Sequence, residues 1–135
     1  TGNYGHYHAF DNNSGTICLM GGSSSDYITV QFPFSINLKS VTITNPASNE
    51  WAMRRCYLYS AVTGNEKPWL TMLSSTVLNS GQGVSTTLNP TANTSGIYYV
   101  QVYGSTWQTS ERHGIAEIKI NFIAKRSDLV SAGLL

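Results

Sequence analysis

Charged residues are scarce in this sequence of 135 residues: Lys, Arg, Asp and Glu together make up 11% of it, and the formal net charge is +1. A chain without a basic field attracts neither a phosphate backbone nor an anionic lipid surface, which argues against nucleic acid and membrane surfaces as partners. No apolar run approaches the ~20 residues of a membrane-spanning helix, and Thr1 to Tyr4 lack the layout of a signal peptide. We therefore expect no membrane insertion.

Cysteine is equally scarce, with only Cys18 and Cys56 in the chain. One disulfide is possible, but the favoured interpretation is two buried free thiols, because two cysteines do not make a disulfide-dense scaffold. The sequence has no C-x-x-C or His/Cys spacing for zinc and no G-x-S-x-G nucleophile elbow. Only seven acidic residues are available to pair as glycosidase carboxylates. We predict that the chain is not an enzyme.

Ser, Thr, Asn and Gly are abundant, as are the eight Tyr, and this composition favours strands and turns over helices. Apolar and polar residues alternate most clearly over 27–32, where Ile28, Val30 and Phe32 share one face. The other predicted strands cover 38–44, 55–60, 69–73, 75–78, 84–88, 97–103 and 115–122. The pattern predicts an all-β sandwich or jelly roll of about eight antiparallel strands, without a helix. Residues 1–123 form this single domain, and 124–135 form a C-terminal tail or linker.

The segment 8–16 gathers oxygen donors around a turn. Asp11 offers a carboxylate, and Asn13 and Thr16 follow at offsets of two and five. Hard cations such as Ca²⁺ take six to eight oxygens from carboxylates, amides, hydroxyls and backbone carbonyls. The alternative is an Asx-type turn whose side chains bond only their own backbone. The local pattern leaves both interpretations open.

Three blocks of the sequence occur in the order found in a known family. They are the turn at 8–16, the paired strands at 27–32 and 38–45, and the closing strands from Tyr98 through Trp107 to Ile120. In this the chain resembles the discoidin, or coagulation factor 5/8 type C, family, and within it the galactose-binding-like carbohydrate-binding modules. Two positions depart from the family pattern: Asn12 replaces a glycine, and Cys18 replaces a tryptophan. The resemblance implies an eight-stranded β-sandwich jelly roll over residues 8–122.

The resemblance also implies a structural calcium ion in the turn. Matching the family position by position gives as ligands the His8 backbone carbonyl, Asp11, Asn13, Thr16 and Glu117. Glu117 fits independently, because the alternation in its strand points it away from the apolar face. The ion would then tie the N-terminal segment to the closing strand.

In the resembling modules, the sugar site is built from three loops at one end of the sandwich. The corresponding loops here carry Tyr4, His6 and Tyr7; Trp51, Arg54 and Arg55; and Trp107, Arg112 and His113. Trp107 is the preferred stacking platform for a sugar, and its alternative role is a buried loop anchor. Arg54 or Arg55 would donate paired hydrogen bonds to vicinal hydroxyls, or would be a solvated strand-end residue. His6 would bond a hydroxyl when neutral, or would be an ordinary surface histidine.

These features predict a non-catalytic carbohydrate-binding module that attaches a larger assembly to cell-surface or extracellular glycans. A galactose-type sugar is one candidate ligand. The low charge and the Ser/Thr/Asn content also resemble bacteriophage tail-fibre adhesin domains, so the predicted location is extracellular or a virion surface. The alternative is a protein-binding or assembly module on the same fold, with 124–135 contacting a neighbouring subunit of a homo-oligomer or of a larger polypeptide. A third hypothesis is an accessory domain of an enzyme.

Overall fold

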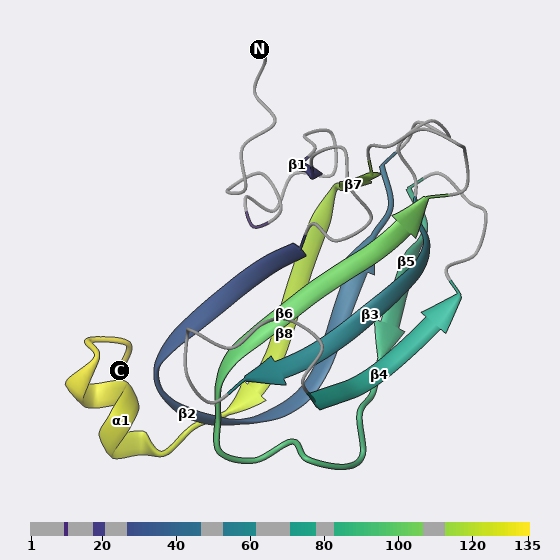
Figure 1. Cartoon of the computed structure of the whole chain (residues 1–135). Helices are drawn as coiled ribbons and strands as arrows, with labels where there is room; N and C mark the ends of the chain where they lie inside the picture. The colour runs from purple at the N-terminus through teal and green to yellow at the C-terminus, as the bar shows by residue number, and fades with distance from the viewer. Residues whose placement is uncertain are drawn as a thin grey trace.

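The computed structural model describes residues 10, 18–20, 27–46, 53–61, 71–77, 83–106 and 113–135. Within these ranges the chain forms eight strands and one helix (Figure 1). The elements are β1 (Cys18–Met20), β2 (Tyr27–Thr44), β3 (Met53–Ala61), β4 (Thr71–Val77), β5 (Ser85–Leu88), β6 (Ile97–Thr106), β7 (His113–Ile115), β8 (Glu117–Ile123) and α1 (Arg126–Ser131). The predicted all-β class is confirmed.

The long strand β2 belongs to both layers of the sandwich. Its first part pairs with β6, and its second part lies between β5 and β8. The sequence predicted two separate strands here, over 27–32 and 38–44, and that division was wrong. The register with β6 shifts between Gln31 and Ile36, and Pro33 falls inside this shift, where its missing N–H interrupts no regular ladder. The proline therefore bends one continuous strand instead of ending it.

All the strand pairings in the described ranges are antiparallel. One layer has the order β4-β3-β6-β2, and the other consists of β5 and β8 on either side of the second part of β2. A separate two-stranded ribbon joins β1 to β7. Figure 1 shows this ribbon at one end of the molecule and α1 at the other end. The sandwich thus has two ends that can be considered separately.

The core between the layers is made by residues of alternating strand positions. Ile118 of β8 is buried while Lys119 is exposed, as the predicted alternation requires, and Ala116 just before the strand is buried as well. Phe122 continues the same face, and its ring meets that of Phe32 edge-to-face at a centroid distance of 5.1 Å. Further buried members come from β2, β3, β5 and β6: Ile28, Phe34, Ile36, Leu38, Val41, Ile43, Cys56, Leu58, Leu88, Ile97, Val100 and Val102.

Short elements account for the other differences from the predictions. A single strand β4 replaces the two predicted over 69–73 and 75–78. The three-residue β1 was not predicted, because alternation cannot be read over so few positions. The helix α1 lies in the segment predicted as a tail, and its Leu129 packs against the core. No helix in the described part of the chain is long and apolar enough to span a membrane.

Candidate functional site

The predicted ligand loops adjoin strand ends that the sheet brings together. The register of β3 with β6 pairs Met53 with Thr106. The segment carrying Trp51 runs directly into Met53, and the segment carrying Trp107 runs directly out of Thr106. Two of the three predicted loops are therefore attached to neighbouring backbone positions. Several of the predicted ligand residues lie outside the described residues: Tyr4, His6, Tyr7, Trp51, Trp107 and Arg112.

Two of the predicted ligand residues lie in β3. Of Arg54 the structure describes only the backbone, but it describes Arg55 in full. Arg55 is half-buried and pairs with Val77 of β4 and Ser105 of β6. Its guanidinium carbon Cζ lies 6.0 Å from the centroid of the Tyr57 ring, within the range of a cation–π contact. This contact gives the arginine a fixed neighbour at the strand end that leads into the loop.

The sequence left open whether Tyr57 and Tyr59 belong to the core or to a site. Tyr57 is half-buried beside Arg55, whereas Tyr59 is 8% exposed. Tyr59 is paired across the sheet with Gln101, which is 3% exposed and whose Oε1 has no hydrogen-bond partner among the described residues. Tyr57 is thus the more accessible of the two tyrosines. Only Tyr57 has a place in a surface site.

Glu117 is the one predicted calcium ligand that the structure describes. It begins β8, is 7% exposed and lies opposite Thr44 of β2. The preceding backbone N–H, that of Ala116, donates a hydrogen bond of 2.9 Å to the Thr44 carbonyl oxygen. Burial and this anchoring hold the start of β8 in place. The other predicted ligands lie outside the described residues: His8, Asp11, Asn13 and Thr16.

The ribbon of β1 and β7 connects the N-terminal segment to Glu117. Cys18 pairs with Ile115, so Thr16 is two residues from one member of this pair and Glu117 is two residues from the other. Polar groups lie at the strand position opposite Glu117: Thr44 Oγ1 and Ser85 Oγ are 2.7 Å apart, and Asn45, which follows Thr44, is 1% exposed. No three His, Cys, Asp or Glu side chains gather among the described residues. A cation at this end would need the oxygen donors of 8–16.

The arrangement of the strands is shared with solved structures of low sequence identity. The first carbohydrate-binding module CBM32-1 of a family 31 glycoside hydrolase from Clostridium perfringens matches with a TM-score of 0.71 at 11% identity, over 89% of this chain and 86% of the other. An F5/8 type C domain from Bacteroides fragilis matches with a TM-score of 0.70 at 12% identity, over 90% and 82%. This chain has the F5/8 type C fold.

A further structure with the F5/8 type C fold was determined with a sugar. It is the family 32 carbohydrate-binding module of Clostridium perfringens NanJ in complex with galactose, with a TM-score of 0.68 at 13% identity, over 91% of this chain and 88% of the other. No protein-family model and no curated protein sequence matches the chain. The resemblance stated from the sequence blocks is therefore confirmed at the level of the fold.

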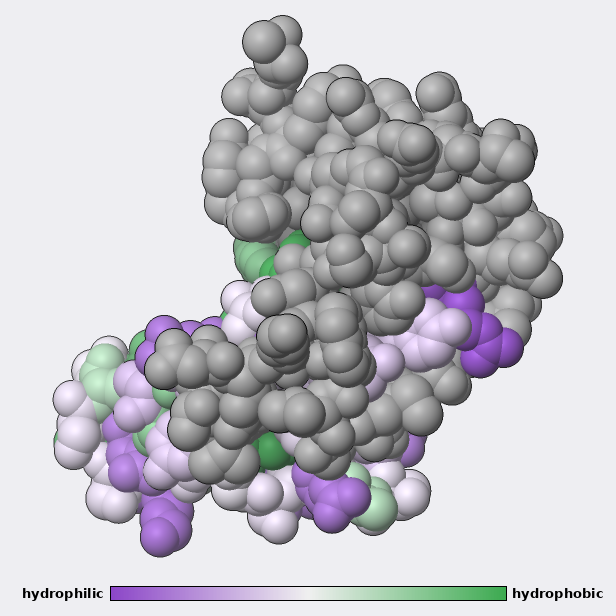
Figure 2. Space-filling view, viewed as in Figure 1, coloured by the Kyte–Doolittle hydropathy of each residue, from purple (hydrophilic) through white to green (hydrophobic). Residues whose placement is uncertain are grey.

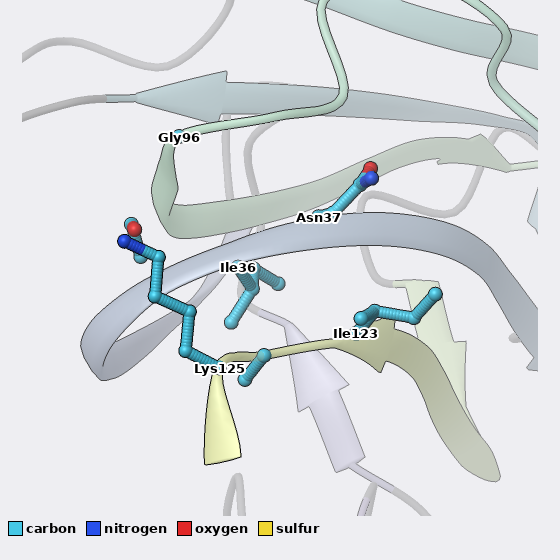
Figure 3. A pocket seen from close by; sticks show the side chains of 7 residues that line it. Ile36, Asn37, Gly96, Ile123 and Lys125 are labelled. Carbon is cyan, nitrogen blue, oxygen red and sulfur yellow. The ribbon is translucent and has the colours of Figure 1, made fainter. Parts of the chain in front are cut away.

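One pocket was missed by sequence reasoning. It has a volume of about 410 Å³ and lies where β2 bends, β6 begins and β8 leads into α1, at the end of the F5/8 type C sandwich opposite to β1 and β7 (Figures 1 and 3). Its lining includes Ser35, Asn37, Gly96, Ile123, Ala124 and Lys125. No motif in the sequence points to it, because the predicted strands leave 33–37 as a connection and 124–135 as a tail.

Proposed function

We propose that the chain is a non-catalytic carbohydrate-binding module that attaches a larger extracellular assembly to glycans. The observation that carries the proposal is the pairing of Met53 with Thr106, which joins the Trp51 and Trp107 segments to one end of an F5/8 type C sandwich. A protein of this fold, the NanJ module, was determined in complex with galactose. A galactose-type sugar is accordingly the first ligand to test.

In this proposal the sugar ring lies against Trp107, and arginines bond its hydroxyls. An aromatic face covers the apolar C–H face of a sugar, while a few fixed polar groups set its orientation. Arg55 suits the second task, since a planar guanidinium donates two parallel hydrogen bonds and Tyr57 lies 6.0 Å from it. Arg54 and Arg112 are further donors, and Trp51 and the segment with Tyr4, His6 and Tyr7 complete the proposed site.

We also propose a structural Ca²⁺ held by Glu117 and by the turn at 8–16. The supporting observations are the polar surroundings of the Glu117 end of β8 and the ribbon that ties Cys18 to Ile115. A buried carboxylate with amide and hydroxyl oxygens is a donor set that suits a hard cation. When bound, the ion supplies charge compensation and cross-links the N-terminal segment to the last strand. The site residues are Glu117 and, from the turn, the His8 carbonyl, Asp11, Asn13 and Thr16.

The proposed location is extracellular or on a virion surface, for example as part of a phage tail fibre. A glycan-attachment role requires exposure to the environment of the cell. The low charge also suits such a surface, because a nearly neutral chain has little non-specific attraction for nucleic acid or anionic lipid.

An assembly module on the same fold is the second candidate, and one observation favours it. Apolar side chains are exposed around α1: Val130 is 52% exposed, Leu134 61% and Leu135 64%. Figure 2 shows hydrophobic residues interspersed with hydrophilic ones at the lower left, where Figure 1 draws α1. Exposed apolar side chains at one end are a feature of protein contacts. In this case the tail would bind a neighbouring subunit.

A glycan array separates the two candidates. The full chain and a variant that ends at Ile123 are applied to the array, and their sedimentation is measured in parallel. The carbohydrate-binding proposal predicts the same set of bound neutral glycans for both proteins. If neither protein binds any glycan and an oligomer of the full chain dissociates on removal of 124–135, the sugar-binding proposal is wrong and the assembly role is supported.

A further inference from the structure

The pocket at the bend of β2 contains groups suited to a small ligand. Its volume of about 410 Å³ lies within the range of roughly 300–1,000 Å³ typical of ligand sites. β2 contributes Ser35, Ile36 and Asn37, while Ile123, Ala124 and Lys125 come from the end of β8 and the connection to α1. The polar groups of the pocket therefore come from two separate segments of the chain.

One polar atom beside the pocket lacks a partner. Asn37 Oδ1 is buried and accepts no hydrogen bond within the described part of the chain. A buried acceptor without a donor destabilises the folded state, and a donor brought by a ligand removes that penalty. Asn37 pairs with Ile123 across β2 and β8, and both residues line the pocket. The missing partner is a hydrogen-bond donor such as a hydroxyl group.

A positive charge lies at the same pocket. Lys125 is exposed, and no carboxylate pairs with it among the described residues. Figure 3 shows its side chain extending along the bend of β2 toward Gly96, with Ile36 and Ile123 further along the pocket. Gly96 has a φ of +70°, and no atom lies within 4 Å of the position that a Cβ would take. The side of the pocket at Gly96 is therefore open, and the exposed Lys125 can meet an anion there.

The remaining lining is apolar. Ile123 is 57% exposed, and Ala124 packs against the core beside it. An apolar surface contacts the C–H groups of a sugar ring favourably, but it offers no partner to the charged groups of a ligand. The pocket thus offers one ammonium group, one acceptor for a hydroxyl group and a small apolar surface. These groups match a sugar ring that carries hydroxyls and one carboxylate.

We propose that this pocket binds an acidic sugar residue of the uronic acid type. The carboxylate would pair with Lys125, a ring hydroxyl would donate to Asn37 Oδ1, and the C–H face would lie on Ile123 and Ala124. This second site lies beside the start of β6, whereas the Trp107 segment follows the other end of that strand at Thr106, so the site does not depend on Trp107. A polymeric acidic glycan could thus be held at a place other than the sugar site proposed above.

Amide chemical shifts test the proposal on the full chain. Sodium glucuronate is titrated at pH 7 in two-dimensional ¹H–¹⁵N spectra, with glucose as the neutral control. Glucuronate is expected to shift the amides of Gly96, Ile123, Ala124 and Lys125 with a saturating dependence, and glucose is expected to shift them less. Lys125→Gln should weaken glucuronate binding about tenfold, the size of one charge-assisted contact. If glucuronate shifts none of these amides, the proposal is wrong.

Two further variants make the result specific. Lys119→Gln removes an exposed lysine of β8 that does not line the pocket, and it should leave glucuronate binding unchanged. Asn37→Leu keeps the side-chain volume but removes the acceptor, so it should weaken binding without lowering the melting temperature. Equal losses for Lys119→Gln and Lys125→Gln would show non-specific attraction by surface charge and would overturn the proposal. Trp107→Ala should leave these shifts intact, so failure of the first sugar site is distinguishable from failure of this one.

Discussion

The guanidinium of Arg55 lies over the ring of Tyr57, two residues further along β3, with 6.0 Å between Cζ and the ring centroid. Because Arg55 and Tyr57 are two residues apart on one strand, their side chains lie on the same face. The pair sits where β3 borders both β4 and β6, close to the strand end that continues into the Trp51 segment. An arginine with a fixed aromatic neighbour loses less conformational entropy when it binds a ligand.

Replacement of Arg55 by lysine should weaken glycan binding. Lysine keeps the charge but loses the planar pair of donors and most of the contact with Tyr57, so we expect about a tenfold lower affinity. The measurement is isothermal titration calorimetry with the glycan that the array identifies. Arg126→Lys, in the exposed helix α1, is the matched control and should bind like the wild type. Equal affinities for the Arg55→Lys protein and the wild type would exclude Arg55 from the site.

Removal of Ca²⁺ should destabilise the protein. Ca²⁺ that binds only the folded state adds about 2.7 kcal/mol to the free energy of unfolding when its free concentration is about 100 times the dissociation constant. This raises the melting temperature by several degrees. A chelator should therefore lower the melting temperature of the wild type. It should have no effect on Asp11→Ala or Glu117→Gln, while Asp128→Ala in α1 should respond like the wild type. Identical melting curves of the wild type with and without chelator would show that the protein binds no structural Ca²⁺.

Cys56 should be unreactive in the folded protein. It is 1% exposed and unpaired, and desolvation by burial raises its pKa from 9.0 to about 12. The thiolate needed for reaction with a thiol reagent is therefore absent near neutral pH. We expect modification of Cys56 only in denaturant, measured by mass spectrometry of the Cys56 peptide. Rapid labelling of this peptide in the native protein would contradict the buried position.

The raised pKa of Cys56 makes the stability of the protein depend on pH in the alkaline range. The unfolded thiol ionises near pH 9 while the folded thiol stays protonated, so the unfolded state binds fewer protons and stability falls as the pH rises toward 12. Between pH 8 and pH 10 the wild type should lose about 1.4 kcal/mol relative to Cys56→Val. Denaturant unfolding of both proteins at the two pH values measures this difference. If the free energies of unfolding of the wild type and Cys56→Val differ by the same amount at both pH values, the thiol is not desolvated.

The strand β2 should be unusually sensitive to truncation of its buried residues, because it contributes to both layers. Ile43 is 0% exposed and lies where β5 and β8 flank β2. Ile43→Ala should lower the free energy of unfolding by about 2–5 kcal/mol through lost burial and the remaining cavity. Val130→Ala, at a 52% exposed position in α1, should change it by less than about 0.5 kcal/mol. Chemical denaturation measures both, and similar values would contradict this core.

The sequence predicted most of the strands from the alternation of apolar and polar residues. The strand predicted over 97–103 lies within β6, whereas the single strand predicted over 115–122 is divided at Ala116 between the end of β7 and β8. The predicted strand over 27–32 stops just before Pro33, but β2 continues through this residue, since a proline can bend a strand as well as end it. The helix α1, with six residues, is too short for a helical period to be visible.

The sites were less predictable than the fold. Arg55 was named as a candidate from its position at a strand end, but its contact with Tyr57 follows from the actual strand geometry. The pocket of Asn37 and Lys125 joins two segments that are far apart in the sequence, and neither carries a motif. Such sites depend on the register between β2 and β8, which a single sequence does not contain. The family resemblance, by contrast, drew on the order of three blocks and identified the fold.

The most direct test of the central claim is the affinity of the Trp107→Ala protein for the glycan selected on the array, measured by calorimetry beside the wild type. Tyr98→Ala, which removes another aromatic residue that is 39% exposed in β6, is the matched control. Loss of a stacking face should reduce affinity by more than about tenfold in Trp107→Ala, while Tyr98→Ala binds like the wild type. Wild-type affinity in the Trp107→Ala protein would contradict the account of this end of the sandwich as the sugar site.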